Sequence, residues 1–275
     1  MAEKFPLGIT HMLDRGLKIA AGIDVGTECV KAVVASEDGR VLGRAVTPAR
    51  GYFQACAFEA LTAAREDAQI AAEDVDAIGA TGFGMDCVAD ASVRASNGAC
   101  HAFGAFQRIS HSMTLVDIGG RDPHVIRVDD LGRRTDARGV RRCALGIGSF
   151  LMFTARHLDV PPTRLQELAA AAERSVTVSS YCSVFSATEV LERLRDGATR
   201  EEVAAGCMRS VAERIVEIGG FTEPLYVCGG VVEYFPGVLQ ALESLAGIPV
   251  RVVPEPMYTA AVGAAMMTLR EGVPS

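Results

Sequence analysis

One short phrase occurs twice in this chain and places an aspartate two residues before a glycine at the end of an apolar run. The first copy covers residues 22–27 (GIDVGT) and the second covers residues 115–120 (LVDIGG). The runs are rich in β-branched residues, which favour strands, and a glycine turn then leads back into apolar sequence. Such a repeat predicts two related halves, each with one aspartate at a strand end.

Two strand ends of this kind suit a nucleoside triphosphate with its magnesium ion. Glycine lets backbone N–H groups approach phosphate oxygens, and a carboxylate faces a hard cation and its waters. We therefore expect Asp24 and Asp117 to act beside ATP and Mg²⁺, with Thr27 and Lys31 assisting the phosphates. The pair Gly229-Gly230 follows another strand-like run and could lie under an adenosine. The absence of a GxxxxGK[ST] sequence disfavours a P-loop ATPase.

The apolar pattern predicts strands followed by helices, in two rounds. Strands are expected at 18–25, 30–35, 41–46, 75–81, 113–118, 125–128, 225–228 and 250–253. Helices are expected at 53–70, 99–109, 147–157, 162–172, 186–195, 200–218, 238–245 and 258–270. This order fits two α/β lobes with a cleft between them. We expect an extension over 1–18, a first lobe over 19–112 and a second lobe over 113–275.

Composition limits the partners of the chain. Its 275 residues carry a net charge of −7, which argues against nucleic acid as a partner. Five arginines between 133 and 142 form either a solvated loop or a docking surface for an acidic partner. The first eighteen residues lack the apolar core of a signal peptide, and no run reaches the ~20 apolar residues of a membrane helix. We therefore expect a cytoplasmic protein without a membrane partner.

The eight cysteines are expected to be reduced, and none forms a CxxC pair. Cys143 and Cys182 each precede a predicted helix, whose N-terminus lowers a thiol pKa and favours an anion. A cysteinyl iron–sulfur cluster is such an anion, and it needs four thiolates, which two copies of the chain would supply. The residues alone leave open that both are small buried apolar groups, as we expect for the other six.

The order of the three glycine turns resembles that of the superfamily of actin, sugar kinases and 70-kDa heat-shock chaperones. The resemblance implies two RNase H-like lobes with phosphate-1, phosphate-2 and adenosine segments in this order. It implies that Asp24 and Asp117 hold magnesium or polarise the attacking water. It further implies a phosphate role for Gly26, Thr27, Gly119 and Gly120, and a nucleoside role for Gly229 and Gly230.

Several longer segments are more specific. GIDVGTECVKAVV, VDIGGRDPHVI, CALGIGSFL, VSSYCSVFSATEV and CGGVV resemble the BadF/BadG/BcrA/BcrD ATPase family, and the similarity extends over residues 19–270. Its members activate 2-hydroxyacyl-CoA dehydratases or serve as ATPase subunits of ATP-dependent benzoyl-CoA reductases. The resemblance implies that Cys143 and Cys182 bind one 4Fe–4S cluster shared between two subunits. ATP hydrolysis would then drive a low-potential electron, received from ferredoxin or flavodoxin, onto partner acyl-CoA reductase or dehydratase subunits.

The two branches of this family differ in the chain across the cluster. The length and the segment 50–54 (RGYFQ) favour the smaller ATPase subunit of a benzoyl-CoA reductase, whose partner is a related, longer subunit. The alternative is a homodimeric activator of a 2-hydroxyacyl-CoA dehydratase. A small-molecule kinase of the same superfamily, without a cluster, and a filament-forming or chaperone-like ATPase are rivals from other classes.

Overall fold

The computed structural model describes residues 16–139, 146–179 and 183–271. They form two compact units. The first lobe comprises the described residues up to Gln107 together with those from Tyr258 onward, and the second lobe runs from Arg108 to Met257. The sequence pattern assigned everything after residue 112 to the second lobe. The helix α10 (Thr259–Glu271) belongs instead to the first lobe, because it packs against the sheet of that lobe.

The first lobe contains a five-stranded sheet in the order β3-β2-β1-β4-β5. Its strands are β1 (Ile19–Val25), β2 (Cys29–Ser36), β3 (Val41–Pro48), β4 (Ala77–Thr81) and β5 (Val93–Arg94). The first three strands form an antiparallel meander, while β4 pairs parallel to β1 and β5 pairs parallel to β4. Every residue of β1 is buried, so both faces of the sheet must be covered.

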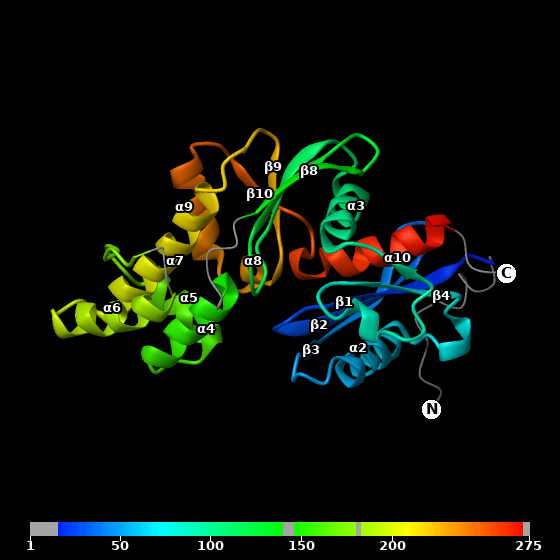
Figure 1. Ribbon diagram of the computed structural model, residues 1–275, viewed down its shortest axis with the longest axis horizontal. Helices are drawn as coiled ribbons and strands as arrows, with labels where there is room; N and C mark the ends of the chain where they lie inside the picture. The colour runs from blue at the N-terminus through cyan, green and yellow to red at the C-terminus, as the bar shows by residue number, and fades with distance from the viewer. Residues whose placement is uncertain (1–15, 140–145, 180–182, 272–275) are drawn as a thin grey trace, which may run out of the picture. The chain divides into compact units, whose positions relative to one another are not determined.

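Helices cover the two faces. Ile23 of β1 lies in one apolar core with alanines of α2 (Phe53–Ala68), and its neighbour Gly22 faces α10. Ile23 and Gly22 face different helices because successive residues of a strand point to opposite faces of the sheet. A Cβ on Gly22 would lie only 2.0 Å from the Ala261 carbonyl oxygen, so α10 packs directly on the backbone of β1. Figure 1 shows α2 and α10 on opposite sides of the strands, and α3 (Asn97–Ile109) beside α10.

The second lobe repeats this sheet. Its strands are β6 (Met113–Asp117), β7 (His124–Val128), β8 (Arg134–Gly139), β9 (Leu225–Cys228) and β10 (Val250–Val252). The order is β10-β9-β6-β7-β8, with β6, β7 and β8 antiparallel and β9 and β10 parallel to β6. This is the order of the first sheet with β6 in the place of β1. The duplication that the repeated aspartate phrase predicts is therefore confirmed.

The second lobe is larger because, among the described residues, six helices lie between its strands. They are α4 (Ile147–His157), α5 (Pro162–Ala170), α6 (Ser183–Arg195), α7 (Arg200–Val216), α8 (Gly230–Tyr234) and α9 (Pro236–Ala246). Phe150, Leu165, Val211 and Leu242 share the core of this lobe with Val116 of β6. Across the described residues, every helix is too short or too polar to cross a membrane.

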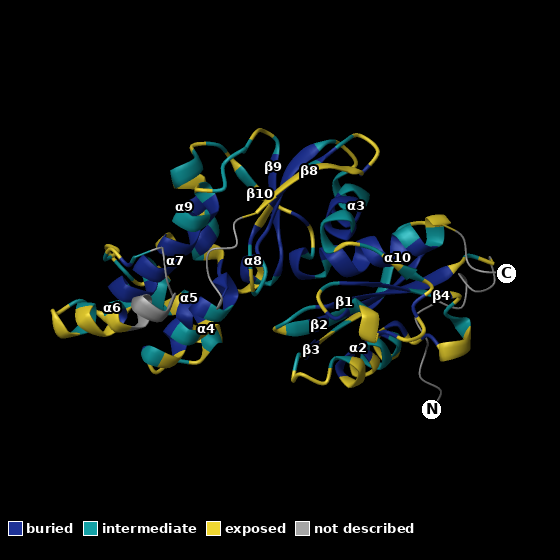
Figure 2. Ribbon diagram, in the orientation of Figure 1, coloured by how far each residue is buried: buried dark blue, intermediate teal, exposed yellow. Residues whose placement is uncertain are grey.

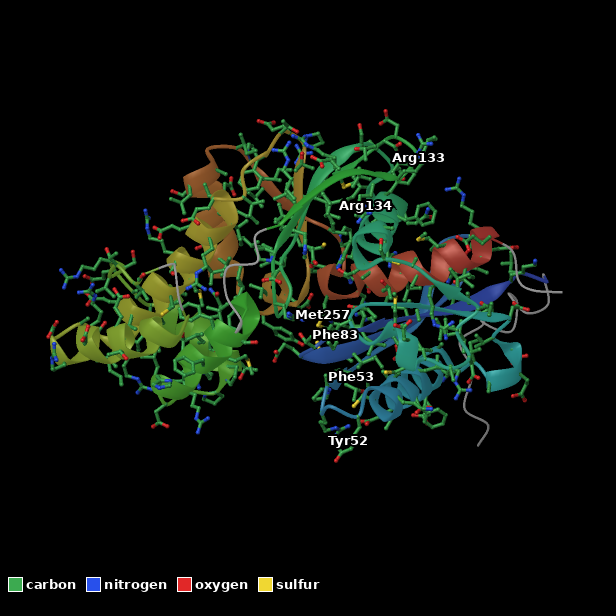
Figure 3. The ribbon with its side chains drawn as sticks, in the orientation of Figure 1. Tyr52, Phe53, Phe83, Arg133, Arg134 and Met257 are labelled. Carbon is green, nitrogen blue, oxygen red and sulfur yellow. The ribbon has the colours of Figure 1, made fainter. Side chains whose placement is uncertain are left out.

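The strand β8 is not predicted by the apolar pattern. All six of its residues are exposed, as Figure 2 shows, and it pairs along one edge with β7. Two of the clustered arginines, Arg134 and Arg138, lie on this edge strand, and Arg133 precedes it (Figure 3). Arg141 and Arg142 fall outside the described residues. The charged residues hide the strand from an apolar pattern, and charge is typical of an edge strand.

Candidate active site

In the first lobe, Asp24 lies near the end of β1 with its side chain buried. The tight turn between β1 and β2 places Lys31 directly opposite it in the antiparallel register. The Lys31 Nζ donates a hydrogen bond to the Asp24 Oδ2 at 3.1 Å. The structure thus brings together a buried carboxylate and a cation, which are the two charges expected around a metal-bound phosphate.

The turn itself needs glycine. A Cβ on Gly26 would lie 2.7 Å from the carbonyl oxygen of Cys29 and 3.3 Å from the Lys31 Nζ. Thr27 follows in the same turn and is half-buried. The four first-lobe residues expected from the sequence therefore lie in or beside one hairpin turn, and the close approach of Cys29 explains why glycine stands at position 26.

Sequence reasoning missed Gly82, which also touches this loop. Gly82 has φ +89°, and a Cβ there would lie 2.5 Å from the Asp24 Oδ1. The N–H of Gly84 donates to the carbonyl oxygen of Val25 at 3.0 Å. Between these glycines, the ring of Phe83 packs edge-on against Phe53, with ring centroids 5.8 Å apart (Figure 3). The GFG turn after β4 was visible in the sequence, but its contact with Asp24 depends on β1 and β4 being neighbours.

In the second lobe, Asp117 ends β6 and is buried, and the turn Gly119-Gly120 follows it. The register of the sheet places His124 opposite Asp117, at the position that Lys31 takes opposite Asp24. Cys228 of β9 lies on the other side of Asp117, as Thr81 does beside Asp24. The loops are thus alike in backbone and differ in the side chains around the carboxylate.

Gly229 joins this second loop. It has φ +105°, and a Cβ would lie 2.4 Å from the Ile118 carbonyl oxygen and 3.0 Å from the Asp117 Oδ1. The Ile118 N–H donates to the Cys228 carbonyl at 2.8 Å. Gly230 begins α8 and has no atom within 4 Å of a Cβ position. The structure therefore places the expected phosphate-2 and adenosine turns side by side in one lobe, with open space at Gly230.

Two further glycines that the sequence did not single out lie on the Gly119-Gly120 turn. They are Gly146, immediately before α4, and Gly148 in its first turn, and both meet Gly120. The GIGS phrase before an apolar helix is the sequence signal that could have identified them.

The two cysteines expected to bind a cluster, Cys143 and Cys182, lie outside the described residues. The other six are free thiols, of which Cys56, Cys100, Cys207 and Cys228 are buried. Burial raises the pKa of Cys100 to about 11 and that of Cys207 to about 12. These thiols are small apolar packing groups, as expected. Cys87 is exposed and Cys29 is half-buried, so these two thiols are not the buried packing groups that the sequence predicts.

The model of the BadF/BadG/BcrA/BcrD ATPase family matches residues 21–268. The chain belongs to this family. The match includes both aspartate loops and the Gly229-Gly230 turn.

Within the family, activators are more similar to the chain than a reductase component is. The activator of lactoyl-CoA dehydratase from Anaerotignum propionicum is 34% identical over 89% of this chain and 95% of its own length. The (R)-2-hydroxyglutaryl-CoA dehydratase activating ATPase from Acidaminococcus fermentans is 32% identical over 91% of this chain and 96% of its own. A benzoyl-CoA reductase component from Thauera aromatica is 29% identical over 91% of this chain and 93% of its own. The preference for the reductase branch is therefore less well supported than its alternative.

Solved structures agree on the fold. The activator of 2-hydroxyisocaproyl-CoA dehydratase from Clostridium difficile, with bound ADPNP, has a TM-score of 0.84 at 27% identity over 92% of this chain and 95% of that one. A ROK family glucokinase from Streptomyces griseus has a TM-score of 0.60 at 15% identity over 92% of this chain and all of the glucokinase chain. The expected fold class, two lobes shared with activator ATPases and sugar kinases, is confirmed.

Proposed function

We propose that this chain is the activator ATPase of a 2-hydroxyacyl-CoA dehydratase system, acting as a homodimer. The observation that carries the proposal is its similarity to the lactoyl-CoA dehydratase activator over nearly the full length of both chains. The two loops support an ATPase, since each combines a buried aspartate with a glycine turn.

In the first loop, Asp24 would face the magnesium ion and Lys31 would neutralise phosphate charge. The ion pair between them holds both side chains at the glycine turn before a ligand arrives. In the second loop, Asp117 would polarise the attacking water while Gly119 and Gly120 present their backbone to the phosphates. Gly229 and Gly230 would meet the nucleoside. Because Asp24 and Asp117 are buried, their charges act in a low-dielectric surrounding, where they interact strongly with a cation or a water.

The cluster is the second part of the proposal. Cys143 and Cys182 of two copies would together supply the four thiolates of one 4Fe–4S cluster. The cluster, when bound, supplies the low-potential electron that a partner dehydratase needs. Ferredoxin or flavodoxin would reduce it. The described residues support ATP handling, and the experiment below tests the cluster.

Anaerobic purification of the chain alone tests this function. We expect a brown homodimer with about two iron ions per chain, ATPase activity and ATP-dependent activation of a dehydratase. Cys143→Ala and Cys182→Ala should each lose the iron and keep nucleotide binding, whereas Cys87→Ala serves as the matched control. A stable complex only with a longer related subunit would favour the reductase branch. A colourless protein that phosphorylates a sugar would refute the proposal.

A further inference from the structure

Helix α4 begins on the second aspartate loop. The N–H groups of Gly148 and Ser149 both donate to the carbonyl oxygen of Gly120, at 3.1 and 3.3 Å. The N–H of Ile147 donates to the carbonyl oxygen of Arg121 at 3.0 Å. The first N–H groups of a helix have no partner within the helix. Here the loop after β6 supplies those partners, in place of the usual side-chain cap.

Glycines make this contact possible. Gly146 has φ +81°, and a Cβ there would lie 2.5 Å from the carbonyl oxygen of Gly120. A Cβ on Gly148 would lie 2.8 Å from the Gly120 Cα and 3.2 Å from the Gly119 carbonyl oxygen. Backbone therefore rests on backbone, with no flexible side chain between the loop and the helix.

The start of α4 is also held firmly by the core of the second lobe. Phe150 and Leu151, in the next turn of α4, have 0% exposure and belong to the core of the second lobe. A displacement of Gly120 of about 1 Å must therefore either break two or three hydrogen bonds or move the start of α4, because packed cores do not deform continuously.

We propose that Gly146 and Gly148 are positioning residues that couple the Asp117–Gly120 loop to the start of α4. The proposal rests on the function proposed above, since it assumes that this loop holds the phosphates of ATP. The exchange of ATP for ADP shifts Gly120, and α4 follows. Cys143 lies three residues before Gly146 in the sequence.

Hydrogen exchange on the cluster-free protein tests the coupling without any electron transfer. The amides of residues 147–149 should exchange at least threefold differently with an ATP analogue than with ADP. The first-turn amides of α7 are an internal control, since Thr199 and Glu202 of that helix form its cap. Equal exchange of residues 147–149 in both nucleotide states would overturn the proposal, while detectable ATP hydrolysis in the same sample would leave the proposed function standing.

A matched pair of variants gives the second test. Gly146→Ala and Gly197→Ala both place alanine at positive φ, but Gly197, at φ +95°, has no atom within 4 Å of its Cβ position. We expect Gly146→Ala to bind ATP and to lose the nucleotide dependence of exchange at 147–149. Gly197→Ala should keep that dependence. A wild-type response in Gly146→Ala would refute the coupling, and if this variant fails to fold, the exchange experiment on the unmodified chain still decides.

Discussion

At the scale of single residues, the two buried aspartates carry different surroundings. Asp24 forms an ion pair with Lys31, whereas the corresponding position opposite Asp117 holds His124. The Lys31 side chain therefore already contacts one carboxylate oxygen of Asp24. The proposed roles differ accordingly, with Asp117 as the group that polarises water.

We expect Asp117→Asn to bind ATP with an affinity within about threefold of the wild type. Its kcat for hydrolysis should fall about 100-fold, because an amide does not accept the proton of the attacking water. Binding by calorimetry and phosphate release give the two values. Asp136→Asn, on the exposed strand β8, is the matched control and should leave both unchanged. Normal turnover in Asp117→Asn would exclude this role.

Gly82→Ala should lower ATP hydrolysis at least tenfold. The new methyl group would collide with the Asp24 carboxylate, in addition to the cost of about 1 kcal/mol for alanine at positive φ. Gly51→Ala carries a similar backbone cost, because Gly51 has φ +80°, but it meets no atom within 4 Å. Steady-state kinetics of the two variants separate the effects. If both variants lose activity equally, the contact with Asp24 is irrelevant.

The raised pKa values of Cys100 and Cys207 predict their reactivity. At pH 8 both thiols stay protonated and are buried, so an alkylating reagent should leave them unmodified in the folded protein. Cys87 is exposed and should react within minutes. Mass spectrometry of the digested protein measures each site, with a urea-unfolded sample as the control. Rapid modification of Cys207 in the folded chain would contradict its burial.

At the scale of elements, α7 has a complete N-terminal cap. The Thr199 side chain accepts from the Glu202 N–H, and the Glu202 carboxylate accepts from the Thr199 N–H. Arg174 also donates to this carboxylate, and these partners hold the pKa of Glu202 below its usual value. Thr199→Ala should lower the free energy of unfolding by about 1 kcal/mol.

The same cap predicts that the free energy of unfolding depends on pH in the acid range. Because the pKa of Glu202 is lower in the folded state, its contribution is fully present above the unfolded value of about 4.3. The contribution is lost as the pH falls through the folded pKa. Urea unfolding between pH 7 and pH 3 should therefore show a smaller decline for Glu202→Gln than for the wild type. Parallel curves would show that the cap does not titrate.

Most elements could be predicted from the sequence, since β1, β2 and α4 follow clear apolar periods, and the Asp38-Gly39 turn joins β2 and β3. The strand β8 could not, because its residues are exposed and it is held by pairing with β7. The site was predicted as three glycine turns that are distant in sequence. The contacts of Gly82 and Gly146 were not, because they join segments that are distant in sequence and meet only in the folded sheet.

At the scale of the whole molecule, the first lobe is built from two distant parts of the chain. Gly22→Ala tests how closely they join, since its methyl group would press on the backbone of α10. We expect a loss of about 3 kcal/mol of unfolding free energy. Gly39→Ala, whose nearest neighbour is Gln107 Oε1 at 3.8 Å, should lose only about 1 kcal/mol at its φ of +86°. Equal losses would mean that α10 adjusts freely.

The placement of α10 has a consequence for biosynthesis. A ribosome makes β1 first and residues 259–271 more than two hundred positions later. One face of the sheet formed by β1 and β4 therefore stays uncovered until α10 is synthesised, after the entire second lobe. The second lobe, being continuous, can acquire its structure during translation, whereas the first can finish only after α10 has left the exit tunnel. The nascent chain thus passes through a stage with an uncovered apolar sheet, which is a surface that a chaperone can bind.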